Sequence, residues 1–174
     1  MITFRKATQQ DIEAVVKIYN DIHTAEEQGH SQIGWVRDVY PTKQTALDSL
    51  ARNNLFVAEL LGEIVGTAII NQTQVEEYNL GNWQYPAKGN EVMVLHTLVI
   101  SPTQAGKGYG KAFVSFYETY AKEHGCPFLR MDTNAKNQAA RSLYQKLGYK
   151  EIGIVPCNFN GIEGISLVLL EKKL

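Results

Sequence analysis

Three glycines at alternate positions from 106 to 110 form the stretch of this sequence best suited to holding a ligand. They follow an apolar run that ends at Ile100 and a proline at Pro102, and they lead into a segment with helical spacing. The first four amides of a helix have no partner within the helix, and the aligned peptide dipoles place roughly half a positive charge there. Glycines let an anion approach the main chain, while Lys107 and Lys111 add positive charge. The stretch therefore predicts a site for a phosphate or pyrophosphate group.

Two common phosphate-binding loops do not fit these residues. A dinucleotide fingerprint would need glycine at Lys111, and a P-loop would need glycine at Ala105 and Ser or Thr at Ala112. The stretch instead resembles motif A of the GNAT (general-control-related N-acetyltransferase) superfamily: strand, proline, then Arg or Gln, two residues, Gly, one residue, and Gly or Ala at the head of a helix. Gly108 and Gly110 match the two glycines. Ala105 departs from the Arg or Gln of the pattern, a change that leaves the main-chain amides untouched.

A second stretch, Asn137–Tyr149, resembles motif B of the same superfamily. In that motif Asn, then Ala, then Leu-Tyr precede a Lys-Leu-Gly-aromatic ending, and the matching positions here are Asn137, Ala140, Tyr144, Gly148 and Tyr149. The two motifs occur in the family's order with plausible elements between them. The resemblance covers nearly the whole chain and is weakest over Val75–Asn90.

The resemblance implies an N-acetyltransferase that binds acetyl-CoA, or coenzyme A, where two parallel strands splay apart, here Glu91–Ile100 and Phe128–Thr133. The pantetheine arm would pair with the backbone of the first strand, and the pyrophosphate would lie on the glycine-rich amides. Tyr144 lies where the family keeps a tyrosine beside the thiol. The residues implied to bind the co-substrate are Leu98, Val99, Ile100, Ala105, Gly106, Lys107, Gly108, Tyr109, Gly110, Lys111, Asn137 and Tyr144.

Acetyl transfer to an amine requires a neutral nitrogen, a developing oxyanion and a departing thiolate. An alkyl ammonium has a pKa of about 10.4, so a base or a water path must remove its proton. Tyr144 can donate a hydrogen bond or a proton to the leaving thiolate. Alternatively, Tyr144 could serve only as a core aromatic residue, because it shares the apolar face of its helix with Ala140 and Leu147.

Glu91 and His96 are the two candidate bases, and both belong to the strand that would border the acetyl group. Strand alternation puts them on opposite faces, so one at most faces the substrate unless the strand is bulged. His96 precedes Thr97–Ile100 much as a histidine precedes the corresponding strand in aralkylamine acetyltransferases. Imidazole, with a pKa of about 6.5, can accept a proton near neutral pH. A structural role for His96 and a water path with no single base stay open as alternatives.

The acceptor site is expected, by resemblance, to be walled by Gln32–Pro41, Val75–Asn90 and Pro156–Gly164. An aromatic wall with Asp38 or Glu91 would suit a cationic amine, whereas Arg37 would suit an acceptor that also carries a carboxylate. Trp35 and Tyr40 could alternatively serve only to cap the core. The candidate acceptor residues are Trp35, Arg37, Asp38, Tyr40, Tyr78 and Trp83.

The elements that must position these residues alternate between strand and helix patterns. Short strands are predicted at 2–6 and 128–132, a hairpin at 55–70, a central strand at 91–100, and closing strands at 149–155 and 165–170 with a loop or ribbon end between them. Helices are predicted from 12, from about 42, through 113–120, and over 137–147. Val75–Asn90 is expected to be a lid or a segment with structure of its own. The sequence thus predicts an α/β fold: a mixed, largely antiparallel sheet with one splayed parallel pair and helices on both faces.

Composition supports one domain, 1–174: 174 residues, 44% of them hydrophobic, with a formal charge of -1. The balanced charge provides no general field for nucleic acid or a membrane, and no signal peptide or membrane span is recognisable. Cys126 and Cys157 lack metal-ligand spacing, so we expect no metal and a reducing, cytoplasmic setting. We predict acetyl transfer to a small-molecule primary amine. A non-catalytic acyl-CoA sensor or partner-binding module, acetylation of a protein or peptide amine, and a homodimer are left open.

Overall fold

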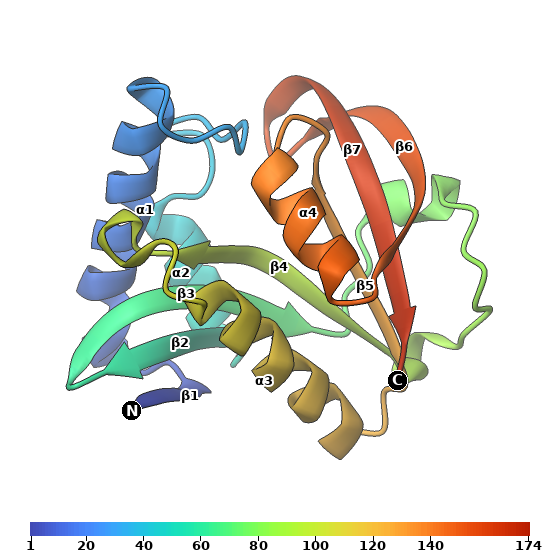
Figure 1. The fold of residues 1–174 in the computed structure, drawn as a ribbon, viewed down its shortest axis with the longest axis horizontal. Coiled ribbons are helices and arrows are strands. Elements are labelled where there is room, and N and C mark those ends of the chain that lie inside the picture. The colour runs from blue at the N-terminus through green and yellow to red at the C-terminus, as the bar shows by residue number, and fades with distance from the viewer.

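The computed structural model describes all residues from Met1 to Leu174 and has a single sheet at its centre (Figure 1). The strands are β1 (Ile2–Lys6), β2 (Leu55–Leu60), β3 (Glu63–Asn71), β4 (Val92–Ile100), β5 (Phe128–Asn134), β6 (Lys150–Phe159) and β7 (Ile162–Lys173). They lie in the order β1-β2-β3-β4-β5-β7-β6. Only β4 and β5 pair in parallel, and every other neighbouring pair is antiparallel. The predicted mixed, largely antiparallel sheet with one parallel pair is confirmed.

The helices cover both faces of this sheet. They are α1 (Ile12–Glu27), α2 (Lys43–Ala51), α3 (Tyr109–Glu123) and α4 (Gln138–Lys146). Figure 1 shows α3 and α4 in front of the sheet, and α2 behind it. Side chains alternate along β2 and pack on both faces of the sheet. Phe56 packs into the core that contains α3, whereas Leu55 and Val57 pack into the core that contains α1. No helix has the length and apolar character that crossing a bilayer would require.

The segment between β3 and β4 has structure of its own. It contains the 3-10 helices η2 (Glu76–Leu80) and η3 (Gly89–Glu91). Tyr78 of η2 packs with Val92, Val94 and Leu169 on the face of the sheet opposite α3 and α4. The segment therefore forms part of the core on that face.

The closing hairpin is longer than the sequence indicated. Residues 156–164, expected as a connection, mostly belong to β6 and β7, and the turn is reduced to Asn160 and Gly161, both with positive φ. Pro156 is accommodated because β6 is an edge strand, where a residue without an N–H group need not break the ladder.

The sheet opens at the middle of β4. Its parallel pairing with β5 runs from Val92 opposite Phe128 to Leu95 opposite Met131 and stops there. On the other edge, Thr67 pairs with Val99 and Ile69 with His96, so that β4 carries an extra residue, and Thr97 at this bulge has a φ of 50°. A bulge bends the strand and shifts its alternation by one residue. The bend carries the second half of β4 away from β5, which produces the predicted splay.

Candidate active site

A cavity of about 130 Å³ lies where β4 and β5 separate. A volume of this size far exceeds the roughly 10–15 Å³ that one water molecule needs. Its walls come from both strands, from α4, from the segment between α1 and α2, and from the β6–β7 hairpin. The lining residues are Ile33, Gly34, Trp35, Tyr40, Val75, Leu95, His96, Thr97, Leu98, Asp132, Thr133, Asn134, Asn137, Ala140, Tyr144, Phe159, Asn160, Ile162, Ile165 and Leu167.

A row of free backbone amides precedes α3. The first hydrogen bond of the helix runs from the Ala112 amide to the Gly108 carbonyl at 3.0 Å, and the amides from Gly106 to Lys111 donate to no protein acceptor. Gly106 and Gly108 have φ values of 76° and 81°, a region that other residues rarely enter. Six adjacent free donors therefore lie at the positive end of a 15-residue helix, where the sequence predicts an anion site.

The predicted co-substrate residues otherwise lie along the opening of the sheet. Leu98, Val99 and Ile100 occupy the part of β4 that pairs with β3 but not with β5, which leaves one backbone edge free. Asn137 caps α4, since its Oδ1 accepts from the Ala140 amide at 3.1 Å; it also lines the cavity, and its NH₂ group has no protein partner. Lys107 donates to Gln104 Oε1 at 2.8 Å, beside the free amides.

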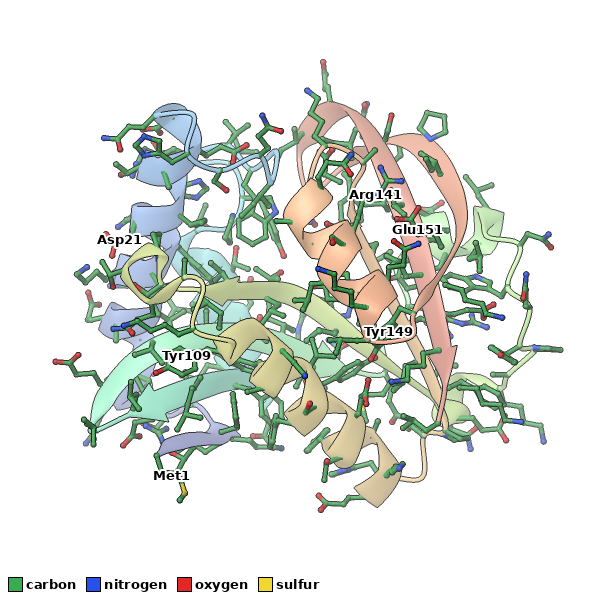
Figure 2. The ribbon with its side chains drawn as sticks, viewed as in Figure 1. Met1, Asp21, Tyr109, Arg141, Tyr149 and Glu151 are labelled. Atoms are coloured by element: carbon green, nitrogen blue, oxygen red, sulfur yellow. The ribbon has the colours of Figure 1, made fainter.

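Tyr144 is both a core residue and a cavity residue. It is 7% exposed within the core that contains α3, and it lines the cavity, where its hydroxyl makes no hydrogen bond. Burial, with the nearby Asp132, raises the pKa of Tyr144, so the hydroxyl keeps its proton at neutral pH. The helix is fixed by an ion pair between Arg141 Nε and Glu151 Oε1 at 2.7 Å, two residues that meet across α4 and β6 in Figure 2.

The two candidate bases differ in position. His96 lines the cavity, and its Nε2 lies 2.9 Å from Asn71 Oδ1, an atom that also accepts from the Thr73 amide. Because an amide oxygen only accepts, His96 carries its proton on Nε2. Burial lowers the pKa of His96 to about 4, so the ring is neutral at pH 7.

Glu91 does not reach the cavity. It ends η3, and its carboxylate accepts from the Lys88 amide at 2.9 Å. Along the strand it precedes His96 by five residues, about 16 Å at the usual rise, and the opening begins only after Leu95. Of the two candidate bases, only His96 therefore lines the cavity.

Asp132 is a cavity residue that sequence reasoning missed. It stands on β5 directly after the last paired residue, Met131, and its Oδ2 accepts from the Tyr78 hydroxyl at 2.7 Å. Burial raises the pKa of Asp132 to about 6, and the Tyr78 hydrogen bond partly offsets that rise. An acidic residue in a predicted strand of apolar neighbours was the available signal.

The candidate acceptor residues divide into three groups. Trp35 and Tyr40 line the cavity, with their rings 6.1 Å apart, and the Tyr40 hydroxyl bonds to Thr97 Oγ1 at the bulge. Tyr78 lies behind Asp132 as its hydrogen-bond donor. The other three, Arg37, Asp38 and Trp83, do not line the cavity.

The positions of these three residues have local causes. Arg37 turns outward to Glu27 Oε1, 2.7 Å from its Nε. Asp38 occupies a turn with a φ of 63° between the bridged residues Val36 and Tyr40. The Trp83 indole donates to the Tyr78 carbonyl at 2.7 Å, and its ring packs against the buried Arg130 guanidinium of β5.

Comparison with known proteins agrees with this geometry. The model of the acetyltransferase (GNAT) family matches residues 12–149, and the chain belongs to that family. An uncharacterized N-acetyltransferase of Methanocaldococcus jannaschii is 23% identical over 88% of this chain and 62% of its own length. N-acetyltransferase family 8 member 2 of Rattus norvegicus is 29% identical over 59% of this chain and 41% of its own length. The chain thus spans between about two fifths and three fifths of these relatives.

Solved structures share the fold. A GNAT-family acetyltransferase from Streptococcus agalactiae superposes with a TM-score of 0.84 at 21% identity, covering 99% of this chain and 95% of that one. The yncA protein from Salmonella typhimurium, solved with its cofactor acetyl-CoA, has a TM-score of 0.70 at 19% identity over 100% of this chain and 94% of that one. These likenesses establish the predicted fold class.

Proposed function

We propose that this protein transfers the acetyl group of acetyl-CoA to the primary amine of a small molecule, by direct attack within a ternary complex. The observation that carries the proposal is the row of free amides from Gly106 to Lys111, which lies at the end of the same opening that Tyr144 lines. An anion-binding helix start and a neutral, buried hydroxyl on one cleft suit a phosphate-bearing thioester.

The co-substrate would lie along the opening between β4 and β5. The amides of Gly106–Lys111 would hold its pyrophosphate, with Lys107 and Lys111 as counter-charges. The free backbone edge of Leu98–Ile100 would pair with the amide groups of its pantetheine arm, in the way that an added strand extends a sheet. The free NH₂ group of Asn137 would contact the arm from the side of α4.

Tyr144 would act on the leaving sulfur. A thiolate develops there as the thioester collapses, and a hydroxyl that is protonated, desolvated and otherwise without a partner stabilises that charge strongly. Burial raises the pKa of the Tyr144 hydroxyl above its usual value of about 10, further from the thiol value of about 8.5, so Tyr144 can pass its proton to sulfur only as another proton replaces it.

The proposal is tested first by calorimetric titration with acetyl-CoA, free coenzyme A and NAD. We expect binding of both coenzyme A forms in the micromolar range, about −8 kcal/mol, and none of NAD. A thiol-release assay across amines, amino acids and peptides would follow. Binding without turnover of any acceptor would favour an acyl-CoA sensor, turnover of peptides alone would favour a protein substrate, and no coenzyme A binding would refute the proposal.

The cytoplasmic setting stays a prediction. It is supported by the two cysteines, Cys126 and Cys157, which are both free thiols.

A further inference from the structure

We propose that Asp132 binds the ammonium group of the acceptor and takes its proton, and that the rest of the acceptor is uncharged and largely apolar. This inference rests on the proposed function and specifies the substrate class of the same site. It derives from the position of Asp132, from the charges around the cavity and from the residues that form its walls.

Asp132 lies on the side of the opening opposite Tyr144. The residues before and after Arg130, Leu129 and Met131, pack into the core beneath α3 and α4. Arg130 and Asp132 point to the other face, where they meet Trp83 and Tyr78 respectively. Because Asp132 and Tyr144 line one cavity from opposite faces of the sheet, a reacting carbonyl between the strands would have a carboxylate on one side and a hydroxyl on the other.

The charged side chains that line the cavity are of one sign, negative. Asp132 is the only acidic residue among the lining residues, and none of them is lysine or arginine. Arg37, the one cation that the sequence suggested for an acceptor carboxylate, is paired with Glu27 outside. A carboxylate on the acceptor would therefore lie near Asp132 without a countercharge, and an unpaired buried charge is costly. An ammonium group, in contrast, would find the only opposite charge available.

Apart from Asp132, the walls of the cavity are uncharged, and most of the lining side chains are apolar or aromatic. Amides, hydroxyls and the neutral His96 ring supply the rest. The apolar and aromatic side chains include those of Ile33, Trp35, Val75, Phe159, Ile162 and Ile165. These side chains favour a hydrocarbon or aromatic body and offer nothing to pair with a second ammonium group.

The reaction balances with these groups. The ammonium nitrogen loses one proton to the Asp132 carboxylate, and its freed lone pair forms the C–N bond with the thioester carbonyl carbon. The C–S bond breaks, and the Tyr144 hydroxyl gives its proton to the sulfur. The second proton of the nitrogen replaces the one that Tyr144 gave, and Asp132 releases its proton to solvent. The net products are an amide, a free thiol and one proton.

The substrate class is tested with matched pairs that differ only in a carboxylate: 2-phenylethylamine against phenylalanine, and isoamylamine against leucine. We expect kcat/KM to be at least roughly 100-fold higher for the amine of each pair, because one unpaired buried charge costs several kcal/mol. 1,4-Diaminobutane should also fall below isoamylamine. Amino acids turned over as well as their amines would overturn the inference.

The role of Asp132 is tested with D132N, which keeps an oxygen that accepts from Tyr78 and removes the charge. We expect kcat/KM for 2-phenylethylamine to fall by roughly 10²- to 10³-fold, the usual contribution of a positioned base. Acetyl-CoA affinity should change less than about twofold because the co-substrate residues lie elsewhere. The matched control is E77Q, a carboxylate-to-amide change near Asp132 but outside the cavity, which should leave kcat/KM unchanged.

A second variant guards against misfolding of D132N. Y78F removes only the hydrogen bond to Asp132, and we expect it to lower kcat/KM by roughly 3- to 10-fold. If acetyl-CoA binds normally but no apolar amine is acetylated, or if D132N and E77Q have equal activity, this inference fails while the coenzyme A cleft stands. Absence of coenzyme A binding would instead refute the proposed function itself.

Discussion

The two sides of the cavity are made of different parts of the protein. On the side of α3 and α4, the proposed co-substrate site consists mainly of backbone groups, with the Gly106–Lys111 amides and the free edge of β4. On the opposite side, the proposed acceptor site consists of side chains from the α1–α2 connection, β5 and the closing hairpin. A backbone site can be specified by one short stretch, whereas a side-chain site depends on which segments the fold brings together.

The acceptor side is also held together by buried charges. Arg130 donates to Gln74 Oε1 at 2.6 Å and to the Tyr85 carbonyl at 3.1 Å. Glu171, 2% exposed, accepts from the Gln84 amide at 2.7 Å. These contacts anchor the segment that carries Tyr78 against the sheet, and Tyr78 in turn holds Asp132. The acceptor side therefore relies on long-range contacts that the co-substrate side does not need.

Apart from the loss of activity expected from D132N, the largest effect is expected from Y144F. Removing the hydroxyl should lower kcat by roughly 100-fold, within the range for loss of a general acid or an oxyanion donor. The acetyl-CoA dissociation constant, measured by calorimetry, should stay within about twofold because the pyrophosphate and pantetheine contacts remain.

Y149F is the matched control for that variant. It removes another buried tyrosine hydroxyl near the same helix, one that donates to Glu118 Oε1 at 3.0 Å outside the cavity. It should cost stability and leave kcat unchanged. Equal rates for Y144F and the wild type would show that the hydroxyl has no chemical role.

The backbone nature of the co-substrate site is tested with G108A and G62A. Both glycines have nearly equal φ values, 81° and 85°, with nothing within 4 Å of an added Cβ. The strain of roughly 1–2 kcal/mol should therefore be similar. Only G108A should weaken acetyl-CoA binding, by roughly 10- to 100-fold, because misdirected amides lose charge-assisted hydrogen bonds. Equal affinities in calorimetry would mean that the amide row does not bind the co-substrate.

The same contrast explains what the sequence could predict. Glycine spacing, a proline and helical periodicity are local properties, and from them followed the prediction of an anion site and the main elements of the sheet. The hairpin end was underestimated because Pro156 and Gly164 are turn signals, yet they lie within β6 and β7, where tertiary pairing overrode them.

Asp132 shows why the acceptor side was harder. Its significance depends on three facts that are not local: pairing with β4 stops one residue earlier, Tyr78 lies 2.7 Å away, and no cation shares the cavity. Arg37 and Asp38 show the opposite case. The charged and aromatic character of their loop favoured them as acceptor residues, but the turn at Asp38 and the ion pair of Arg37 with Glu27 place both outside the cavity. The bulge of β4 lies at Thr97, beyond both Glu91 and His96, and it inverts the alternation only for the second half of the strand.

A third prediction uses the stability of D132N. Burial raises the pKa of Asp132 from 3.8 to about 6 in the folded state, so its ionisation disfavours folding. The penalty is absent below the unfolded pKa, grows between pH 4 and 6, and is complete above. At pH 8, D132N should therefore be more stable than the wild type by about 1–2 kcal/mol, after allowance for the opening to the cavity.

Thermal unfolding of both proteins across this pH range would measure that difference. The groups that face or lie near Asp132 are Tyr78, Tyr40, Tyr144, His96, Glu77 and Cys157. Burial lowers the pKa of His96 to about 4, and burial raises the pKa of Tyr40 to about 12, so neither titrates between pH 5 and 8. If the stability difference between D132N and the wild type does not vary with pH, burial does not destabilise the charged form of Asp132.

The smallest effect is expected from H96Q. His96 donates from Nε2 to Asn71 and is neutral, with its pKa lowered by burial to about 4, which makes the ring a weak proton acceptor. Glutamine can keep the donor to Asn71 while removing the second ring nitrogen, so kcat/KM should change less than about fivefold. This variant separates the two titratable groups that share the acceptor side of the cavity. A loss of 100-fold or more, with D132N near wild type, would make the histidine the base and leave Asp132 a structural residue.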